Sequence, residues 1–211
     1  MIFETRCAGC DAPGRPICTT CRFALLGRPP ASPPPGVIAA LPFTGRVRSV
    51  VLGMKYRNRR AVGRHLAGLL VNRIVEEGLH RDIDIVTWAP TSAKRRRERG
   101  FDQGELLAQT VARQLGVPCR RVLDRRSPAT QTGRNRRERL GGVSFAVRPG
   151  LSGRRVLVVD DVVTTGATLS SAVAALESTG ASAQAVAVAA TPDRHLAPVV
   201  AIPERRRSVA A

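Results

Sequence analysis

Apolar and polar positions along this chain follow two periods, and their order predicts an α/β architecture. Short runs rich in β-branched or small apolar residues, typical of strands buried on both faces, occur at 37–43, 82–88, 156–159 and 185–190. Apolar residues recur every three or four positions between and after these runs, which predicts helices near 47–54, 62–78, 103–115 and 169–176. Asp102 is placed to cap the helix at 103–115. Strands that alternate with helices form a mostly parallel sheet with helices on both faces, so we expect this fold.

The stretch around the third predicted strand carries the most distinctive chemistry. Two adjacent carboxylates, Asp160 and Asp161, are predicted to follow the carboxyl end of the strand at 156–159. The next helix begins after a small, mostly hydroxylic turn made of Thr164, Thr165, Gly166, Ala167 and Thr168. Such a turn presents backbone N–H groups and the positive end of a helix, which together favour a phosphate. We therefore expect an anion site with two acids beside it, where open α/β sheets bind ligands.

Four cysteines near the N-terminus form two closely spaced CxxC pairs: Cys7 and Cys10, then Cys18 and Cys21. Each pair can present two thiolates from one tight turn, and four thiolates complete a tetrahedral Zn²⁺ shell. The pattern predicts a structural zinc knuckle, with a reactive dithiol or a remnant that no longer binds metal as the alternatives. Cys119 has no cysteine nearby and is expected to be a small core residue.

Proline-rich sequence separates these cysteines from the α/β pattern. We expect a zinc-binding knuckle at 1–28, a linker at 29–36, the main domain at 37–191 and a tail at 192–211. The sequence contains no run of about 18 apolar residues that would cross a membrane, and its first residues do not resemble a signal peptide. These features predict a cytoplasmic protein without membrane insertion, and they leave open a homodimer.

Positive charge is concentrated in the middle of the chain. The net charge of +18 favours an anionic partner, such as nucleic acid, a polyphosphate or a membrane surface, although a GC-rich genome also enriches arginine. Fourteen of the 34 basic residues lie between Lys94 and Arg139. The candidate contacts to nucleic acid or phosphate are Lys94, Arg95, Arg96, Arg97, Arg136 and Arg137. Those before residue 102 are expected in a loop, whereas 124–150 has no periodic pattern and is either disordered or a functional lid. Lys55, one of only two lysines, is expected to be solvated.

Two classes of protein that could place an anion site beside such a pair of acids are excluded by the sequence. A Walker-type ATPase needs the pattern GxxxxGK[ST], and neither Lys55 nor Lys94 follows a glycine. A phospho-receiver domain would need a later acceptor aspartate and a lysine, but no lysine follows Lys94.

A third chemistry fits. VLVVDDVVTTGAT, from Val156 to Thr168, resembles the phosphoribosyl pyrophosphate (PRPP) signature of type I phosphoribosyltransferases. The chain is similar to the ComF family over nearly all of the stretch from Cys7 to Ala190. The similarity rests on KRRRERGFDQGELLA, on Gln131 with the later arginine cluster and Phe145, and on the N-terminal cysteine pairs. Two positions depart from that family's pattern: Asp102 stands where the family commonly has asparagine, and Arg139 falls where a further asparagine is expected.

The resemblance implies roles for the residues of the motif. Asp160 and Asp161 would bind the ribose hydroxyls, directly or through Mg²⁺, and the turn Thr164–Thr168 would hold the 5′-phosphate. Arg99 and Gly100 fall where the pyrophosphate loop would lie, and 125–140 where a mobile loop would cover the site. Purine-salvage relatives carry an acid at the position of Thr164, and a threonine cannot replace it as a general base at neutral pH.

We therefore expect a ComF-like protein with a phosphoribosyltransferase fold, which binds PRPP with Mg²⁺ and transfers phosphoribose to an unidentified acceptor. The alternative is a nucleic-acid-binding factor for DNA uptake, which contacts single-stranded DNA or other competence proteins and uses PRPP only as a regulator.

Overall fold

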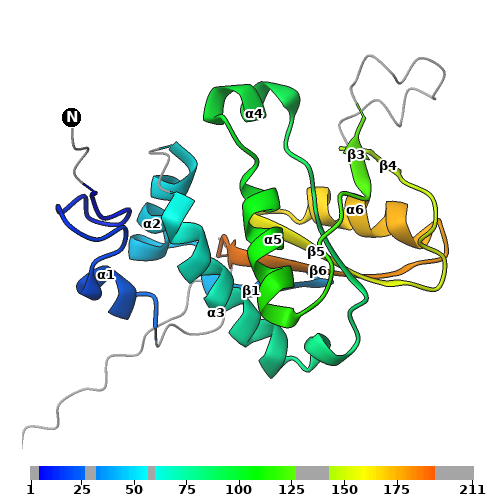
Figure 1. Ribbon diagram of the computed structural model, residues 1–211, viewed down its shortest axis with the longest axis horizontal. Helices are drawn as coiled ribbons and strands as arrows, with labels where there is room; N and C mark the ends of the chain where they lie inside the picture. Colours follow the sequence, from blue (N-terminus) through cyan, green and yellow to red (C-terminus); the bar gives the residue numbers. More distant parts are fainter. Residues whose placement is uncertain (1–4, 27–31, 57–59, 127–142, 193–211) are drawn as a thin grey trace, which may run out of the picture.

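The computed structural model describes residues 5–26, 32–56, 60–126 and 143–192, and its centre is a parallel sheet of four strands (Figure 1). These strands are β1 (Val37–Pro42), β2 (Ile85–Trp88), β5 (Arg155–Val163) and β6 (Ser182–Ala190). Their order in the sheet is β1-β6-β5-β2, and every neighbouring pair is parallel. The predicted mostly parallel sheet is confirmed.

Helices cover both faces of this sheet, because both faces are apolar. Alternate residues of a strand point to opposite sides, and here both sets are largely hydrophobic. Leu157 and Val159 of β5 join a core with α2 (Gly45–Tyr56), α3 (Gly63–Glu76) and α5 (Gln103–Leu115). Val156 and Val158 join a second core, with α6 (Ala167–Glu177) on the other face. No helix in the described part of the chain is both long and apolar enough to cross a membrane.

Several shorter elements connect this framework. Two 3₁₀ turns lie at Arg60–Val62 and Leu79–Arg81. An antiparallel pair, β3 (Leu123–Arg125) and β4 (Phe145–Val147), packs with α6 and was not predicted, because each strand is only three residues long. The segment between these two strands contains Arg136 and Arg137, which lie outside the described residues, so the expectation of a disordered region or a lid stays untested there.

The basic segment before residue 102 is partly helical, whereas the sequence pattern indicated a loop. Helix α4 (Ala93–Arg99) begins at Ser92, whose hydroxyl accepts a hydrogen bond from the backbone N–H of Arg95. It ends at Gly100, which adopts the left-handed conformation (φ 72°) that glycine tolerates best. The caps and good helix formers produce this helix without an apolar stripe, and α4 rises above α5 at the top of Figure 1.

The cysteine-rich segment packs directly on α2, at the left of Figure 1. Cys7, Ala8 and Cys21 are buried in the same core as Val50, and α1 (Thr19–Phe23) carries Cys21. A Cβ atom on Gly53 of α2 would overlap the carbonyl oxygen of Ala8. The absence of a side chain at Gly53 therefore allows the segment to approach the helix backbone closely.

Candidate functional site

The two acids of the motif lie within a strand and not beyond its end. β5 continues through both acids to Val163, and Asp160 and Val162 pair with Ala187 and Ala189 of β6. Aspartate is a poor strand former, but pairing with a central neighbour outweighs this local preference. The expectation that the strand ends before the acids is therefore wrong. Because adjacent strand residues alternate in direction, the two carboxylates start on opposite faces of the sheet.

Asp161 forms an ion pair with Lys55. The Nζ atom of Lys55 lies 2.8 Å from Oδ1 of Asp161, and their side chains are only 14% and 10% exposed. Lys55 reaches Asp161 from the last turn of α2, on the face of the sheet that this helix covers. The expectation that Lys55 is solvated is wrong, because folding brings together residues about a hundred positions apart.

Asp160 has an unusual electrostatic environment. Burial and the neighbouring charge of Asp161 raise the pKa of Asp160 to about 7, although Lys55 and a hydrogen bond from the backbone N–H of Asp161 oppose this shift. That hydrogen bond ends on Oδ1 of Asp160 and measures 2.7 Å. Burial and nearby Arg95 lower the pKa of Arg125, whereas the charge of Asp160 raises it. Asp160 is therefore poised between its neutral and charged forms near neutral pH.

The hydroxylic turn follows β5 at the same edge. Gly166 adopts a left-handed conformation (φ 81°) and begins α6, with no side-chain hydrogen bond to cap the helix. The Oγ1 atom of Thr165 accepts a hydrogen bond from the N–H of Ala167 at 3.4 Å. Thr164 and Thr165 are exposed. The structure therefore brings the predicted turn, the N-terminus of α6 and the two acids together at the carboxyl end of β5.

A charged cavity of about 440 Å³ lies at the carboxyl end of the neighbouring strand β2. Its wall includes the loop from Pro90 to Ala93 and four arginines: Arg96, Arg121, Arg125 and Arg126. Arg125 also donates a hydrogen bond of 3.5 Å to the carbonyl of Pro90. Three acids, Asp102, Glu105 and Asp124, partly balance this positive charge. Such a cavity can accept an anion with several oxygen atoms.

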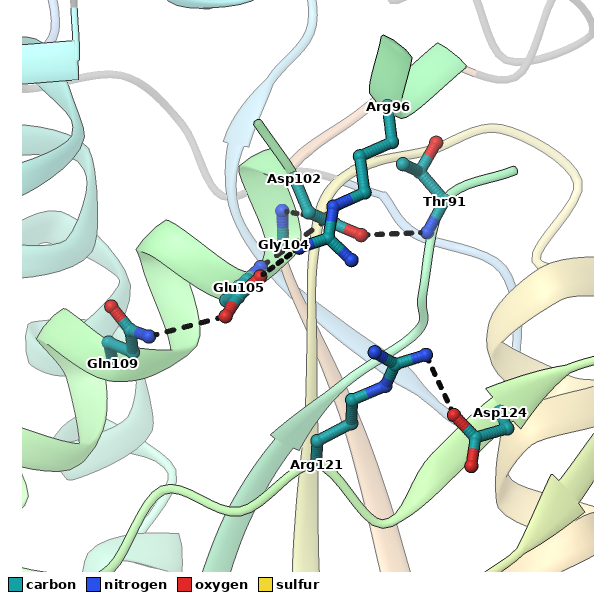
Figure 2. A network of polar contacts seen from close by, with 8 residues as sticks. All are labelled: Thr91, Arg96, Asp102, Gly104, Glu105, Gln109, Arg121 and Asp124. Atoms are coloured by element: carbon teal, nitrogen blue, oxygen red, sulfur yellow. Dashed lines mark hydrogen bonds and ion pairs between the residues drawn. The ribbon is translucent and has the colours of Figure 1, made fainter. Parts of the chain in front are cut away.

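Asp102, in the wall of this cavity, accepts hydrogen bonds from both Gly104 and Thr91, as Figure 2 shows. One of its carboxylate oxygens accepts hydrogen bonds from the N–H groups of Gly104 (3.0 Å) and Glu105 (3.4 Å), which caps α5. The other accepts a hydrogen bond of 3.0 Å from the N–H of Thr91, in the loop after β2. Two further ion pairs, Arg121 with Asp124 and Arg96 with Glu105, flank it. The predicted helix cap at Asp102 is confirmed, and the clamp on Thr91 is an addition.

The predicted nucleic-acid or phosphate contacts before residue 102 lie on α4, and one of them, Arg96, also lines the charged cavity. Lys94, Arg95, Arg96 and Arg97 are exposed on α4. Arg99 instead points back to α5, where its Nη1 atom donates a hydrogen bond of 2.8 Å to Oε1 of buried Gln103. Gly100 ends the helix. In this structure Arg99 and Gly100 therefore connect α4 to α5.

The four N-terminal cysteines converge. All four sulfur atoms lie within 4.8 Å of one another, and those of Cys10 and Cys18 are 3.6 Å apart. Four sulfurs held tetrahedrally at about 2.3 Å from Zn²⁺ would be separated by about 3.8 Å, so the cluster has a suitable size. Burial disfavours the Cys7 thiolate, but backbone N–H donors outweigh it and lower the pKa of Cys7 to about 6. This donor set therefore fits a zinc ion. Cys119 lies apart from the cluster, half-buried against the core.

Three residues important for this geometry were missed or undervalued in the sequence. They are Lys55, Asp102 as a loop clamp, and Arg125. The scarcity of lysine was the only signal for Lys55, and no local pattern could show which acid it would meet.

Comparisons with known proteins agree with this architecture. A family model described as a phosphoribosyl transferase domain matches residues 102–202. Together with the parallel sheet and its acidic strand, this match defines a protein with the type I phosphoribosyltransferase fold.

Proteins of similar sequence identify the family to which the chain belongs within this fold class. The DNA utilization protein YhgH of Salmonella typhimurium is 31% identical over 68% of this chain and 67% of its own length. The same-named protein of Escherichia coli K12 is 28% identical over 85% of this chain and 81% of its own length. The competence protein ComFC of Streptococcus pneumoniae is 34% identical, over 44% and 41%. The chain belongs to the ComF family.

Proposed function

We propose that this protein binds PRPP together with Mg²⁺ at the carboxyl end of β5. The observation that carries this proposal is that Asp160, Asp161 and the N-terminus of α6 lie at one edge of the sheet. The turn Thr164–Thr168 would hold the 5′-phosphate through backbone N–H groups and hydroxyls. Asp160 and Asp161 would bind the ribose hydroxyls, directly or through the cation.

The pyrophosphate group would occupy the charged cavity beside β2. Arg125 and Arg96 line this cavity, and Arg125 interacts electrostatically with Asp160. Arginine forks bind phosphate oxygens through paired hydrogen bonds. We retain Arg99 and Gly100 as candidate pyrophosphate contacts, through rearrangement of the segment that links α4 to α5.

The reaction supported by such a site is transfer of phosphoribose to a nitrogen nucleophile. The nucleophile forms a bond to C1′ of the ribose as the bond from C1′ to the pyrophosphate oxygen breaks. Mg²⁺ would neutralise charge that develops on the departing pyrophosphate. Arginines of the cavity would stabilise the same charge. Thr164 supplies no general base, so the acceptor must be nucleophilic without help from that position.

Calorimetry with PRPP and Mg²⁺ tests the binding site. The double variant Asp160→Asn/Asp161→Asn should lose measurable affinity. Asp82→Asn/Asp84→Asn is the matched control, because it removes two acids that pair with Arg155 at the opposite end of β5. Equal affinity of the wild-type protein and the Asp160/Asp161 variant would show that the site is wrong.

Once PRPP binding is established, screening nitrogenous metabolites for PRPP-dependent release of pyrophosphate would identify an acceptor.

A second candidate function is binding of single-stranded DNA, in a protein that uses PRPP only as a regulator. The observation in its favour is α4, which presents Lys94, Arg95, Arg96 and Arg97 to solvent. Such binding should weaken steeply with salt. The triple variant Arg95→Gln/Arg96→Gln/Arg97→Gln should abolish it, and absence of binding by the wild-type protein at low salt would exclude this function. Arg136 and Arg137 would add contacts, and other competence proteins or a second copy of the chain are further candidate partners in the cytoplasm.

We also propose that Cys7, Cys10, Cys18 and Cys21 bind one structural zinc ion. Elemental analysis should find one zinc per chain in the wild-type protein, and less in Cys10→Ser. Cys119→Ser is the control, because Cys119 lies outside the cluster. Equal zinc contents in all three proteins would contradict this assignment.

A further inference from the structure

Lys55 is the one lysine among the described residues that is largely buried, and its partner is an acid of the PRPP-type motif. We propose that Lys55 is an internal counterion that occupies Asp161 before ligand binding and is displaced when a divalent cation binds there. This inference rests on the proposed function, because it concerns the cation that would accompany PRPP.

The geometry supports direct competition for one carboxylate. The Nζ atom of Lys55 lies 2.8 Å from Oδ1 of Asp161, at the distance of a charge-assisted hydrogen bond. A cation bound to that oxygen would come within a few ångströms of the ammonium group, and two unscreened positive charges repel strongly at such a distance. The low exposure of both side chains, 14% and 10%, limits screening by water. Lys55 and the cation therefore cannot share Asp161 without movement of the lysine.

The choice of lysine is informative in a chain whose other basic residues are almost all arginine. An arginine here could bind the carboxylate with a planar, bidentate fork. The ammonium of lysine is a compact charge on a flexible stem of four carbons, so it can leave the carboxylate by rotation of its side chain. Lysine therefore suits a partner that is held and then released.

Lys55 also makes cation binding depend on the anionic ligand. With Lys55 on Asp161, the acid pair attracts a free cation less strongly than two unpaired carboxylates would. Mg²⁺ is commonly bound by one or two carboxylates together with phosphates of a substrate, which add negative charge. The cation should therefore bind weakly alone and more tightly when it arrives with PRPP.

Binding of Mn²⁺ to the zinc-loaded full chain, followed by electron paramagnetic resonance without PRPP, tests this inference. Lys55→Gln should bind Mn²⁺ about tenfold more tightly than the wild-type protein. The double variant Lys55→Gln/Asp161→Asn should lose this gain. Arg48→Gln is the matched control, because it removes one exposed positive charge from the same helix and should leave the affinity unchanged. If folded Lys55→Gln binds Mn²⁺ no more tightly than the wild-type protein, the proposal is wrong.

A second measurement uses the wild-type protein and does not depend on whether a variant folds. Lysine labelled with ¹⁵N at Nζ gives only two signals, because the chain has two lysines. A titration with Mg²⁺ should shift the Lys55 signal toward the position of the Lys94 signal, because Lys94 is exposed. The Lys94 signal itself should not shift. An unmoved Lys55 signal would overturn the proposal. Because neither experiment contains PRPP, failure here is distinguishable from failure of PRPP binding.

Discussion

Lys55 and Asp161 form an ion pair that links the C-terminal turn of α2 to the central strand β5, with 2.8 Å between Nζ and Oδ1. The pair joins an element that the sequence presents as an ordinary core helix to the most distinctive motif of the chain. It sets the charge of the candidate site, because Asp161 raises the pKa of Asp160 while Lys55 lowers it.

Removal of one partner of this pair should lower the stability of the protein more than removal of both partners. Lys55→Met should lower the free energy of unfolding by about 3 kcal/mol, because it leaves Asp161 as an unpaired buried charge. The double variant Lys55→Met/Asp161→Leu should recover most of that loss, since well-packed apolar residues often replace a buried pair without cost. Urea denaturation of the wild-type protein, Lys55→Met, Asp161→Leu and the double variant measures both effects. Equal stabilities of the single and double variants would indicate that the pair is effectively solvated.

Asp160 should make the protein less stable as pH rises toward neutrality. Its pKa is about 7 in the folded protein and near 3.8 in an unfolded chain, so the folded state holds more protons between these values. Stability attributed to Asp160 therefore falls from about pH 4 to pH 7 and is constant above that. Asp160→Asn removes this titration. The free energy of unfolding of the variant minus that of the wild-type protein should therefore be about 2 kcal/mol greater at pH 8 than at pH 5.5.

Urea unfolding at the two pH values measures this difference, and Asp82→Asn is the control because Asp82 is largely exposed at the far end of the sheet. A difference that does not change with pH would show that Asp160 is ionised throughout.

Asp102→Asn should weaken the loop after β2. The amide can cap α5 with its single oxygen, but its NH₂ group would face the N–H of Thr91 where a carboxylate oxygen now accepts a hydrogen bond. We expect a loss of about 1–3 kcal/mol in the free energy of unfolding. Faster hydrogen exchange at Thr91, with the N–H of Gly104 still protected, would confirm that the loop contact alone is lost. Protection of Thr91 equal to that in the wild-type protein would contradict the clamp.

Two glycine-to-alanine substitutions in neighbouring helices should have opposite effects. Gly53→Ala in α2 should displace the cysteine-rich segment, because the new Cβ overlaps the Ala8 carbonyl oxygen. Gly68→Ala in α3 meets no atom within 4 Å and should stabilise the protein by up to about 1 kcal/mol. Thermal unfolding measures stability, and the rate of zinc transfer to a chelator reports on the cysteine-rich segment. Zinc loss that is no faster in Gly53→Ala than in Gly68→Ala would contradict the docking.

The sequence alone determined the layout of the chain. Buried strands and amphipathic helices are local patterns, since side chains repeat every 2 residues in strands and every 3.6 in helices, and the parallel α/β fold followed from their order. The cysteine cluster and the VLVVDDVVTTGAT motif were also readable, because each places its functional groups within a short stretch. The cap at Asp102 was readable for the same reason.

Tertiary structure decided how these parts combine. The extension of β5 through both acids depends on pairing with β6, and the ion pair with Lys55 depends on where α2 lies on the sheet. The three-residue strands β3 and β4 exist through mutual pairing and packing on α6. Each depends on residues distant in sequence, and the free energy of such contacts is not encoded in local periodicity. The sequence therefore indicated the candidate site residues, and the fold decided that one of the two acids, Asp161, already has a partner.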